Sequence, residues 1–262
     1  MLEYRPRLYH ILTYGCQANE RDSETIAGLL DSCGYEPTSN IDEADIIIIN
    51  TCCVRHTAEN KVYGKLGELK ILKRQNPQLI IGVCGCMAQQ KEAAEKLYRR
   101  APHIDLLFGT HNTHRLPELL ERTLATGRPV MDVWEREGEI VEELPVHRNP
   151  GIRAYINIMY GCDNFCSYCI VPYVRGHERS RRLKDILREV ETGVNQGYRE
   201  IMLLGQNVNS YGKGLAEEVD FADLLTEVDQ IPGLERIRYM TSHPKNFSEK
   251  IIRAIVDSKH VC

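Results

Sequence analysis

The sequence has few aromatic residues, no long hydrophobic run and no surplus of positive charge, and each shortage excludes a class of protein. Its 262 residues include one tryptophan and four phenylalanines. Apolar runs such as Ile46–Ile49 fall far short of the roughly 20 residues that cross a membrane. The 33 Lys and Arg against 37 Asp and Glu give a formal net charge of −4, so a nucleic-acid contact needs a local basic patch.

The N-terminal stretch MLEYRPRLYHILTYG has neither the long apolar segment nor the small-residue cleavage site of a secretory signal. We therefore expect a cytoplasmic protein without a membrane partner. Cysteine, by contrast, is abundant, with ten copies. Disulfide frameworks are rare in the reducing cytosol, so ten cysteines in such a chain indicate a metal or redox function.

The first part of the chain alternates between strand-like and helix-like segments. Helices are indicated by apolar residues at i, i+3, i+4 and i+7, as in Ile26, Leu29, Leu30 and Cys33. Predicted strands span 8–13, 45–50, 79–84 and 104–108, and predicted helices span 22–33, 59–74, 88–100 and 115–124. This order predicts an α/β fold with a mostly parallel sheet covered by helices.

Residues 127–150 break the alternation. The stretch is acidic and is predicted to link a first domain, 1–126, to a second, 151–262, with one short strand at Ile140-Val141. The second domain is predicted to hold strands 153–159, 200–204 and 236–240 and helices 183–194, 221–228 and 247–255. Three βα pairs leave a long unpaired sheet edge, which proteins normally cover. We therefore expect the sequence to be a fragment of a longer protein.

The most specific motif is a cysteine triplet in the loop after the first strand of the second domain. Cys162, Cys166 and Cys169 place three thiolates within eight residues, and such thiolates can converge on an iron–sulfur cluster. Three ligands for four irons leave one iron open to another molecule. The alternative is a zinc site with His177 as fourth ligand, but its spacing matches no zinc motif.

A second set of cysteines is spread over three predicted loops. Cys16, Cys52 and Cys86 follow the first three strands, and in a parallel sheet these loops meet at one edge, beside helix N-termini. Helix N-termini stabilise anionic sulfur, so a second three-thiolate site is favoured over coincidence. Cys53 is adjacent to Cys52, and position alone does not say which of the two faces the site.

The other cysteines have simpler interpretations. Cys33 completes the apolar stripe of its helix, and Cys84 lies in a buried strand, so both are expected in the core. For Cys262 the sequence supports no assignment.

Together these motifs resemble the radical S-adenosylmethionine methylthiotransferases. The matching stretches are distributed along the chain and are TYGCQANERDSE (13–24), NTCCVRHTAENK (50–61), GVCGCMAQ (82–89), YINIMYGCDNFCSYCIVPYVRGHERSR (155–181) and LLGQNVNSYG (203–212). Gln17, Asn164-Phe165 and Gln206–Ser210 favour the tRNA-modifying branch. Two departures from the family pattern are Cys53 and Cys84. The resemblance implies a flavodoxin-like first domain followed by the first part of a radical-SAM (βα)6 partial barrel.

The resemblance also implies two 4Fe-4S clusters and S-adenosylmethionine. Cys162, Cys166 and Cys169 match the ligands of the radical-generating cluster, and Cys16, Cys52 and Cys86 match those of an auxiliary cluster. The implied reaction adds a methylthio group to C2 of N6-dimethylallyladenosine at tRNA position 37, through a 5′-deoxyadenosyl radical. The implied partners are the anticodon loop of tRNA and an electron donor such as a flavodoxin or ferredoxin, with the enzyme itself a monomer.

Further site residues are predicted around the triplet. Tyr168 matches a family aromatic near the adenine of S-adenosylmethionine, although it could also pack beneath the loop. Gln206, after the second strand of the barrel, could bind the amino group of S-adenosylmethionine, or cap a turn. The one dense basic cluster is predicted to contact phosphate or carboxylate rather than only solvent, and it comprises Arg175, Arg179, Arg181 and Arg182.

Two alternative functions remain at the level of sequence. One is the same chemistry on threonylcarbamoyl-adenosine tRNA or on a ribosomal-protein aspartate. The other is a non-catalytic, metal-stapled nucleic-acid-binding module. The 262-residue chain alone is expected to be much less active than the full-length protein.

Overall fold

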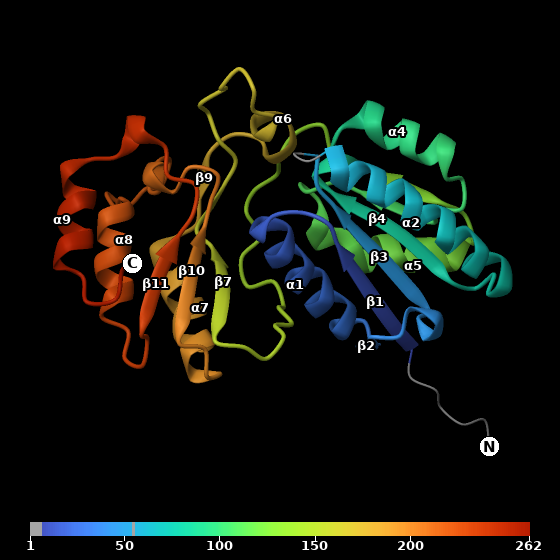
Figure 1. The fold of residues 1–262 in the computed structure, drawn as a ribbon, viewed down its shortest axis with the longest axis horizontal. Helices are drawn as coiled ribbons and strands as arrows, with labels where there is room; N and C mark the ends of the chain where they lie inside the picture. The colour runs from blue at the N-terminus through green and yellow to red at the C-terminus, as the bar shows by residue number, and fades with distance from the viewer. Residues whose placement is uncertain (1–6, 54–55) are drawn as a thin grey trace. The chain divides into compact units, whose positions relative to one another are not determined.

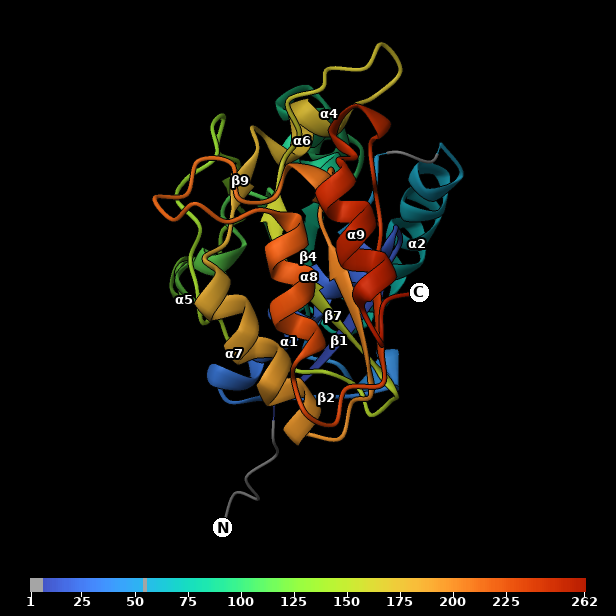
Figure 2. The same ribbon diagram turned by 90° about the vertical axis from the view of Figure 1, so that its left-hand side faces the viewer.

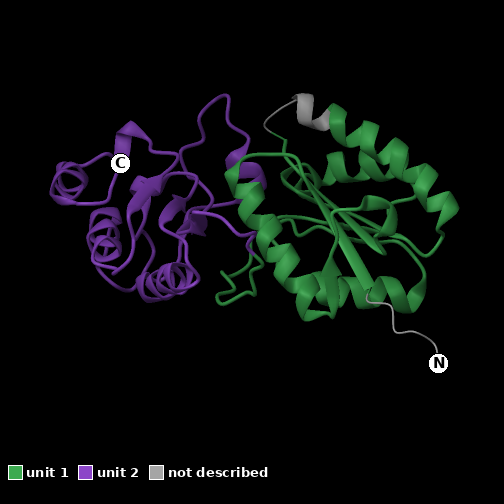
Figure 3. Ribbon diagram, turned by 60° about the horizontal axis from the view of Figure 1, so that its bottom comes forward, with its two compact units in different colours: residues 1–147 green, residues 148–262 purple. Residues whose placement is uncertain are grey.

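The computed structural model describes residues 7–53 and 56–262. Residues 1–6 of the N-terminal stretch, and Val54-Arg55 of the matching stretch 50–61, lie outside the described residues. The chain divides into two compact units, Met1–His147 and Arg148–Cys262 (Figure 3). Within the described residues, no helix is both long enough and apolar enough to cross a membrane.

Unit 1 is built on a six-stranded sheet in which every neighbouring pair is parallel. Its order is β2-β1-β3-β4-β5-β6, which contains the flavodoxin-like order and confirms that prediction (Figure 1). Its strands are β1 (Arg7–Thr13), β2 (Tyr35–Pro37), β3 (Ile46–Thr51), β4 (Ile80–Gly85), β5 (Leu106–Phe108) and β6 (Val130–Asp132). β3 and β4 are buried on both faces, as expected for a sheet covered by helices.

Helices cover both faces of this sheet. α1 and α5 share one core cluster with Ile46 and Ile48, whereas α2 and α4 share another with Ile47 and Ile49, so β3 alternates between the two faces. The helices are α1 (Gln17–Ser32), α2 (His56–Gln75), α3 (Cys86–Gln89), α4 (Lys91–Arg100) and α5 (Leu116–Thr126), and the short 3₁₀ turns are η1 (Ile41–Glu43) and η2 (Thr113–Arg115).

Unit 1 departs from the sequence prediction in its shortest elements. β2 and β6 were not predicted, since three residues are too few to show a period, and no strand forms at Ile140-Val141. The predicted helix 88–100 is two helices, because Gln90 is extended. The predicted linker 127–150 contains β6, whose residue Val130 is buried in the core of unit 1.

Unit 2 has a three-stranded parallel sheet of order β11-β10-β7 and a two-stranded antiparallel pair, β8-β9. The strands are β7 (Arg153–Asn157), β8 (Met159–Tyr160), β9 (Arg179–Ser180), β10 (Glu200–Leu204) and β11 (Arg236–Tyr239). The helices are α6 (Val171–Arg175), α7 (Leu183–Asn195), α8 (Phe221–Asp229) and α9 (Glu249–Asp257), with η3 (Val208–Ser210) and η4 (Pro244–Asn246) between them.

The long helices of unit 2 pack on its parallel sheet. α7, α8 and α9 stand side by side and share one core with β7, β10 and β11 (Figure 2). The outer edge of β11, predicted to be unpaired, is partly paired. Ile237 N donates to His260 O at 2.8 Å, and Cys262 N donates to Ile237 O at 3.0 Å.

Candidate metal centres

The cysteine triplet of unit 2 lies in one loop between β8 and α6. The loop begins at Gly161, whose backbone φ of +75° and whose approach to the carbonyl of His177 leave no room for a Cβ atom. Gly161 N donates to Gln206 Oε1 at 2.6 Å, and Cys162 N donates to Gly176 O at 3.1 Å. Cys169 N donates to Cys166 O at 2.8 Å. The loop is therefore held at its base by backbone contacts, while its three thiols are not in disulfides.

The thiols of the triplet differ in their surroundings. Cys162 is buried, and burial raises the pKa of its thiol. Cys166 is half-buried, with its Sγ 4.0 Å from Nε2 of His243. His243 Nδ1 accepts a hydrogen bond from Lys245 N at 3.2 Å, so in the neutral imidazole the proton is on Nε2. The histidine thus aims an N–H group at the Cys166 sulfur.

The second set of cysteines lies at one edge of the sheet of unit 1. Cys16 is the N-cap of α1, three residues after the end of β1; Cys52 follows β3; Cys86 is the first residue of α3, after β4. β1, β3 and β4 are neighbours in the sheet, so its parallel order brings the three loops to adjacent positions. Cys52 and Cys86 are buried and Cys16 is exposed.

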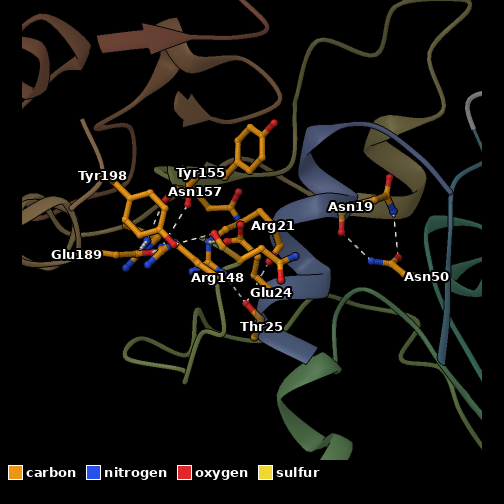
Figure 4. A network of polar contacts seen from close by, with 12 residues as sticks. Asn19, Arg21, Glu24, Thr25, Asn50, Arg148, Tyr155, Asn157, Glu189 and Tyr198 are labelled. Atoms are coloured by element: carbon orange, nitrogen blue, oxygen red, sulfur yellow. Dashed lines mark hydrogen bonds and ion pairs between the residues drawn. The ribbon is translucent and has the colours of Figure 1, made fainter. Parts of the chain in front are cut away.

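Two fully buried asparagines connect the first two of these loops (Figure 4). Asn19 Nδ2 donates to Asn50 Oδ1 and to Thr51 O, both at 3.1 Å. Asn50 Nδ2 donates to Asn19 O and to Ser23 Oγ, both at 2.9 Å. The start of α1 and the end of β3 are therefore fixed to each other beside Cys16 and Cys52.

The remaining cysteines are placed as follows. The side chain of Cys53 is hydrogen-bonded to Cys86, and this bond together with burial raises the pKa of the Cys53 thiol. Cys84 belongs to the core, which confirms its prediction. Cys33 is exposed at the C-terminal cap of α1, so its prediction as a core residue is wrong. The helix ends at Ser32, one residue before Cys33, and the last buried residue of the stripe is Leu30.

The donor chemistry at both places suits iron–sulfur clusters, whose usual ligands are cysteine thiolates. The fold brings the thiols to one loop and to one sheet edge. Among the side chains that the structure describes, those of residues 7–53 and 60–262, no three Cys, His, Asp or Glu residues already stand at metal-binding separations. Closing either set around a metal cluster therefore requires side-chain movement.

Tyr168 and Gln206 lie on the two loops that follow β8 and β10. Tyr168 is 89% exposed, so it does not pack beneath the cysteine loop. Gln206 is half-buried, and its Oε1 accepts the hydrogen bond from Gly161 N. That oxygen has a second lone pair, which leaves it able to accept from an ammonium group. Contacts of both residues with S-adenosylmethionine stay predictions.

The predicted basic cluster does not form one surface patch. Arg175 and Arg181 are buried, and Arg181 Nη1 donates to Glu189 Oε2 at 2.6 Å and to Asn157 O at 2.7 Å. Within the same unit, Glu189 also pairs with Arg148 at 2.5 Å (Figure 4). An external phosphate or carboxylate contact does not fit the burial of Arg175 and Arg181, and the carboxylate that Arg181 contacts is Glu189 of its own unit. Sequence spacing cannot show that an arginine points inward.

The other two arginines of that cluster are more accessible. Arg182 is exposed and pairs with Asp185 at 2.5 Å, and Arg179 is half-buried, with its guanidinium 5.9 Å from the ring centre of Tyr160. A phosphate contact therefore stays a prediction for Arg179 and Arg182 alone.

A polar cavity of about 450 Å³ opens beside the cysteine loop of unit 2. Its lining includes Asp163 and Asn164 from that loop, Asn209 and Lys213 from the segment after β10, and Lys245 after β11. Sequence reasoning did not single out His243, Asn19 or Asn50. His243 lies in the segment after the third strand of its sheet, as Gln206 lies in the segment after the second, and that placement could have indicated it.

Comparisons with known proteins give one family match within each of the two units. Residues 8–109 match the uncharacterized protein family UPF0004, and residues 156–261 match the radical SAM superfamily. A tRNA-2-methylthio-N(6)-dimethylallyladenosine synthase of Clostridium perfringens is 57% identical over 98% of this chain and 57% of its own length. A synthase of the same name from Syntrophomonas wolfei is 56% identical over 99% of this chain and 58% of its own length. Over 98–99% of its own length the chain is thus similar to these synthases, and its second unit carries the radical SAM match.

The chain thus spans somewhat more than half the length of these relatives. Among solved structures, the radical S-adenosylmethionine methyltransferase TsrM of Kitasatospora setae, with cobalamin and a [4Fe-4S] cluster bound, aligns with a TM-score of 0.61. The alignment covers 98% of this chain and 60% of TsrM at 14% identity. At that identity the likeness shows a shared fold.

Proposed function

We propose that the protein to which this chain belongs adds a methylthio group to C2 of N6-dimethylallyladenosine at tRNA position 37. The observation that carries the proposal is the presence of two separate three-cysteine sets. One follows β8 in the radical SAM unit, and the other lies along the edge formed by β1, β3 and β4. Relatives 56–57% identical to the chain carry the name of this activity.

The match to the radical SAM superfamily supports an iron–sulfur cluster and S-adenosylmethionine as cofactors. We assign Cys162, Cys166 and Cys169 to this cluster, which when bound supplies the electron that cleaves S-adenosylmethionine. A second 4Fe-4S cluster, held by Cys16, Cys52 and Cys86, is the proposed carrier of the sulfur. The role of the protein is to hold both cysteine sets in place and to limit the access of water to the clusters.

The proposal gives roles in substrate and cofactor binding to four side chains near the triplet that are exposed or half-buried. Tyr168 contacts the adenine of S-adenosylmethionine, and Gln206 accepts from its amino group through Oε1. Gln206 is suited to this because its hydrogen bond with Gly161 already fixes it to the cysteine loop. Arg179 and Arg182 contact the phosphates of the tRNA.

The proposed partners follow from the chemistry. The substrate is the anticodon loop of tRNA, and the electron donor is a small redox protein such as a flavodoxin or ferredoxin. The proposed enzyme is a monomer in the cytoplasm, which is compatible with both the tRNA substrate and the electron donor. With two proposed phosphate contacts, this chain should bind tRNA weakly, with a Kd on the order of 10⁻⁴–10⁻⁶ M at physiological salt.

Nucleoside mass spectrometry tests the proposal. A strain that lacks methylthio modification receives either the full-length gene or the segment for these 262 residues, and its tRNA is analysed. The full-length protein is expected to restore the 2-methylthio form of N6-dimethylallyladenosine and to consume two molecules of S-adenosylmethionine per product. We expect the 262-residue chain to be much weaker, since S-adenosylmethionine would sit in a more water-exposed site.

Other outcomes separate the alternatives. Methylthiolation of threonylcarbamoyl-adenosine, or of a ribosomal-protein aspartate, would move the proposal to another substrate of the same chemistry. A colourless protein after anaerobic reconstitution would indicate zinc and a non-catalytic module, because iron–sulfur clusters absorb broadly in the visible range. Equal restoration by the 262-residue chain would show that the rest of the protein is dispensable.

A further inference from the structure

The side chain of Asn19 uses all of its hydrogen-bonding hydrogens at the edge that carries the distributed cysteines. Its Nδ2 donates to Asn50 Oδ1 and Thr51 O, each at 3.1 Å. Its Oδ1 accepts from Cys16 N at 3.3 Å and lies 3.6 Å from Cys16 Sγ. One amide group thus contacts Cys16 directly and the residue immediately before Cys52.

The backbone around this amide is shaped to accommodate it. A Cβ atom on Gly15 would lie 2.2 Å from Asn19 Oδ1, so only glycine fits beside it. A Cβ atom on Gly85, which precedes Cys86, would lie 2.4 Å from Asn50 Oδ1 and 2.3 Å from Thr51 O. The two asparagines therefore contact the backbone before each of the three cysteines.

We propose that Asn19 and Asn50 are positioning residues that hold Cys16, Cys52 and Cys86 ready for the auxiliary cluster. The inference rests on the proposed function, which assigns that cluster. Both asparagines are fully buried, and Asn50 Nδ2 is in turn held by Ser23 Oγ at 2.9 Å. Partners that orient metal ligands from outside the coordination sphere typically change metal affinity by about 10–100-fold when they are removed.

The chemistry of the site explains why asparagine is needed. An aspartate at 19 has nearly the same shape but no N–H group, so Thr51 O and Asn50 Oδ1 would lose their donor. It would also place a negative charge 3.6 Å from the Cys16 sulfur, where it would repel the anionic sulfur of a cluster ligand. Asn19→Asp therefore tests the donor and the charge with little change in volume.

The experiment uses a background in which Cys162, Cys166 and Cys169 are alanine, so that all bound iron belongs to unit 1. The protein is reconstituted anaerobically, and iron per chain and the EPR spectrum of the reduced cluster are measured. The parent should bind about four irons. We expect Asn19→Asp to lose most of that iron, with the remainder giving an altered EPR spectrum.

Asn112 supplies the matched control. It is equally buried in unit 1 and fixes the loop after β5, where Gly109 N donates to its Oδ1 at 3.0 Å and its Nδ2 donates to Asp132 O at 2.8 Å. No proposed ligand lies on that loop. Asn112→Asp should lower the melting temperature of unit 1 about as much as Asn19→Asp does, yet keep its iron.

Full iron and an unchanged EPR spectrum in Asn19→Asp would overturn the inference. Equal loss in Asn112→Asp would do the same, because it would reduce the effect to general instability. If Asn19→Asp does not fold, Asn19→Ser, which leaves room for water, gives the same test. A parent without iron would refute the second cluster of the proposed function, and the inference with it.

Discussion

The two cysteine sets of this protein are built in opposite ways. In unit 2, three thiols lie within eight residues of one loop, and the local chain already keeps them together. In unit 1, Cys16, Cys52 and Cys86 are far apart in sequence and become neighbours only because β1, β3 and β4 pair in parallel. The first set depends on one loop, whereas the second depends on a folded sheet.

The difference determines what supports each set. The loop of unit 2 needs a tight start at Gly161 and a tie to Gln206. The set of unit 1 needs long-range polar contacts, such as Asn19 with Asn50, because no short segment contains two of its proposed ligands. We therefore expect changes in the core of unit 1 to affect its proposed metal site more than equal changes in the core of unit 2 affect the proposed site there.

Removing one whole set is the largest test of this comparison. Replacing Cys162, Cys166 and Cys169 by alanine should halve the iron of the reconstituted chain, from about eight to about four, and abolish cleavage of S-adenosylmethionine. Iron determination and an assay for 5′-deoxyadenosine measure the two effects. Unchanged iron would show that the triplet binds no cluster.

The adjacent pair Cys52-Cys53 tests the set of unit 1. Cys52→Ala should lose the auxiliary cluster and keep the other one. Cys53→Ser should keep both, since the contact of Cys53 with Cys86 and its raised pKa favour a neutral thiol rather than a ligand. Optical and EPR spectra show which variant loses the auxiliary cluster. Loss in Cys53→Ser but not in Cys52→Ala would make Cys53 the ligand.

Much of the fold could be predicted from the sequence. β3 and β4 were visible as continuous apolar runs, and their alternation with helices indicated the parallel sheet. β2 and β6 were not visible, since each has three residues and is held by pairing with β1 or β5. The start of α1 was predicted five residues late, because its polar first turn has no apolar period.

The site was predictable where chemistry is local. The cysteine triplet is defined by the spacing of its residues, and that spacing can be read directly from the sequence. The direction in which a side chain points cannot be read from the sequence. Arg181 was therefore predicted to contact a phosphate or carboxylate of a bound molecule, although it pairs with Glu189 inside unit 2. The hydrogen bonds of Asn19 were equally hidden, since they join positions 31 and 32 residues apart.

Glycines at the base of each set provide a smaller test. Gly85 has φ 92° and ψ −167°, a region essentially restricted to glycine, and its Cβ atom would clash with Thr51 O. We expect Gly85→Ala to destabilise unit 1 by about 2–5 kcal/mol and to reduce the iron of the auxiliary cluster. Gly161→Ala should act likewise on unit 2 and on the other cluster. Chemical denaturation and iron content measure both.

Gly34 is the control for these two variants. It also has a positive φ, of 81°, but nothing lies within 4 Å of its Cβ position. Gly34→Ala should therefore cost only the strain of the left-handed conformation, about 1–2 kcal/mol, and leave both clusters intact. An equal cost at Gly34 and Gly85 would show that the close approach of Thr51 and Asn50 is unimportant.

The smallest expected effect concerns His243, the group that distinguishes the surroundings of the two sets. Its Nε2–H is aimed at Cys166 Sγ, and an N–H group near a cluster sulfur stabilises the reduced state. His243→Phe should therefore keep the iron and move the reduction potential of the triplet cluster to a more negative value.

His177→Phe is the control, because His177 also lies beside the loop but its Nδ1 contacts Asp163 at 2.7 Å. EPR-monitored redox titration compares the two variants with the parent. A shift in His177→Phe as large as that in His243→Phe would trace the effect to the loop as a whole, whereas a shift confined to His243→Phe would trace it to the N–H···S contact.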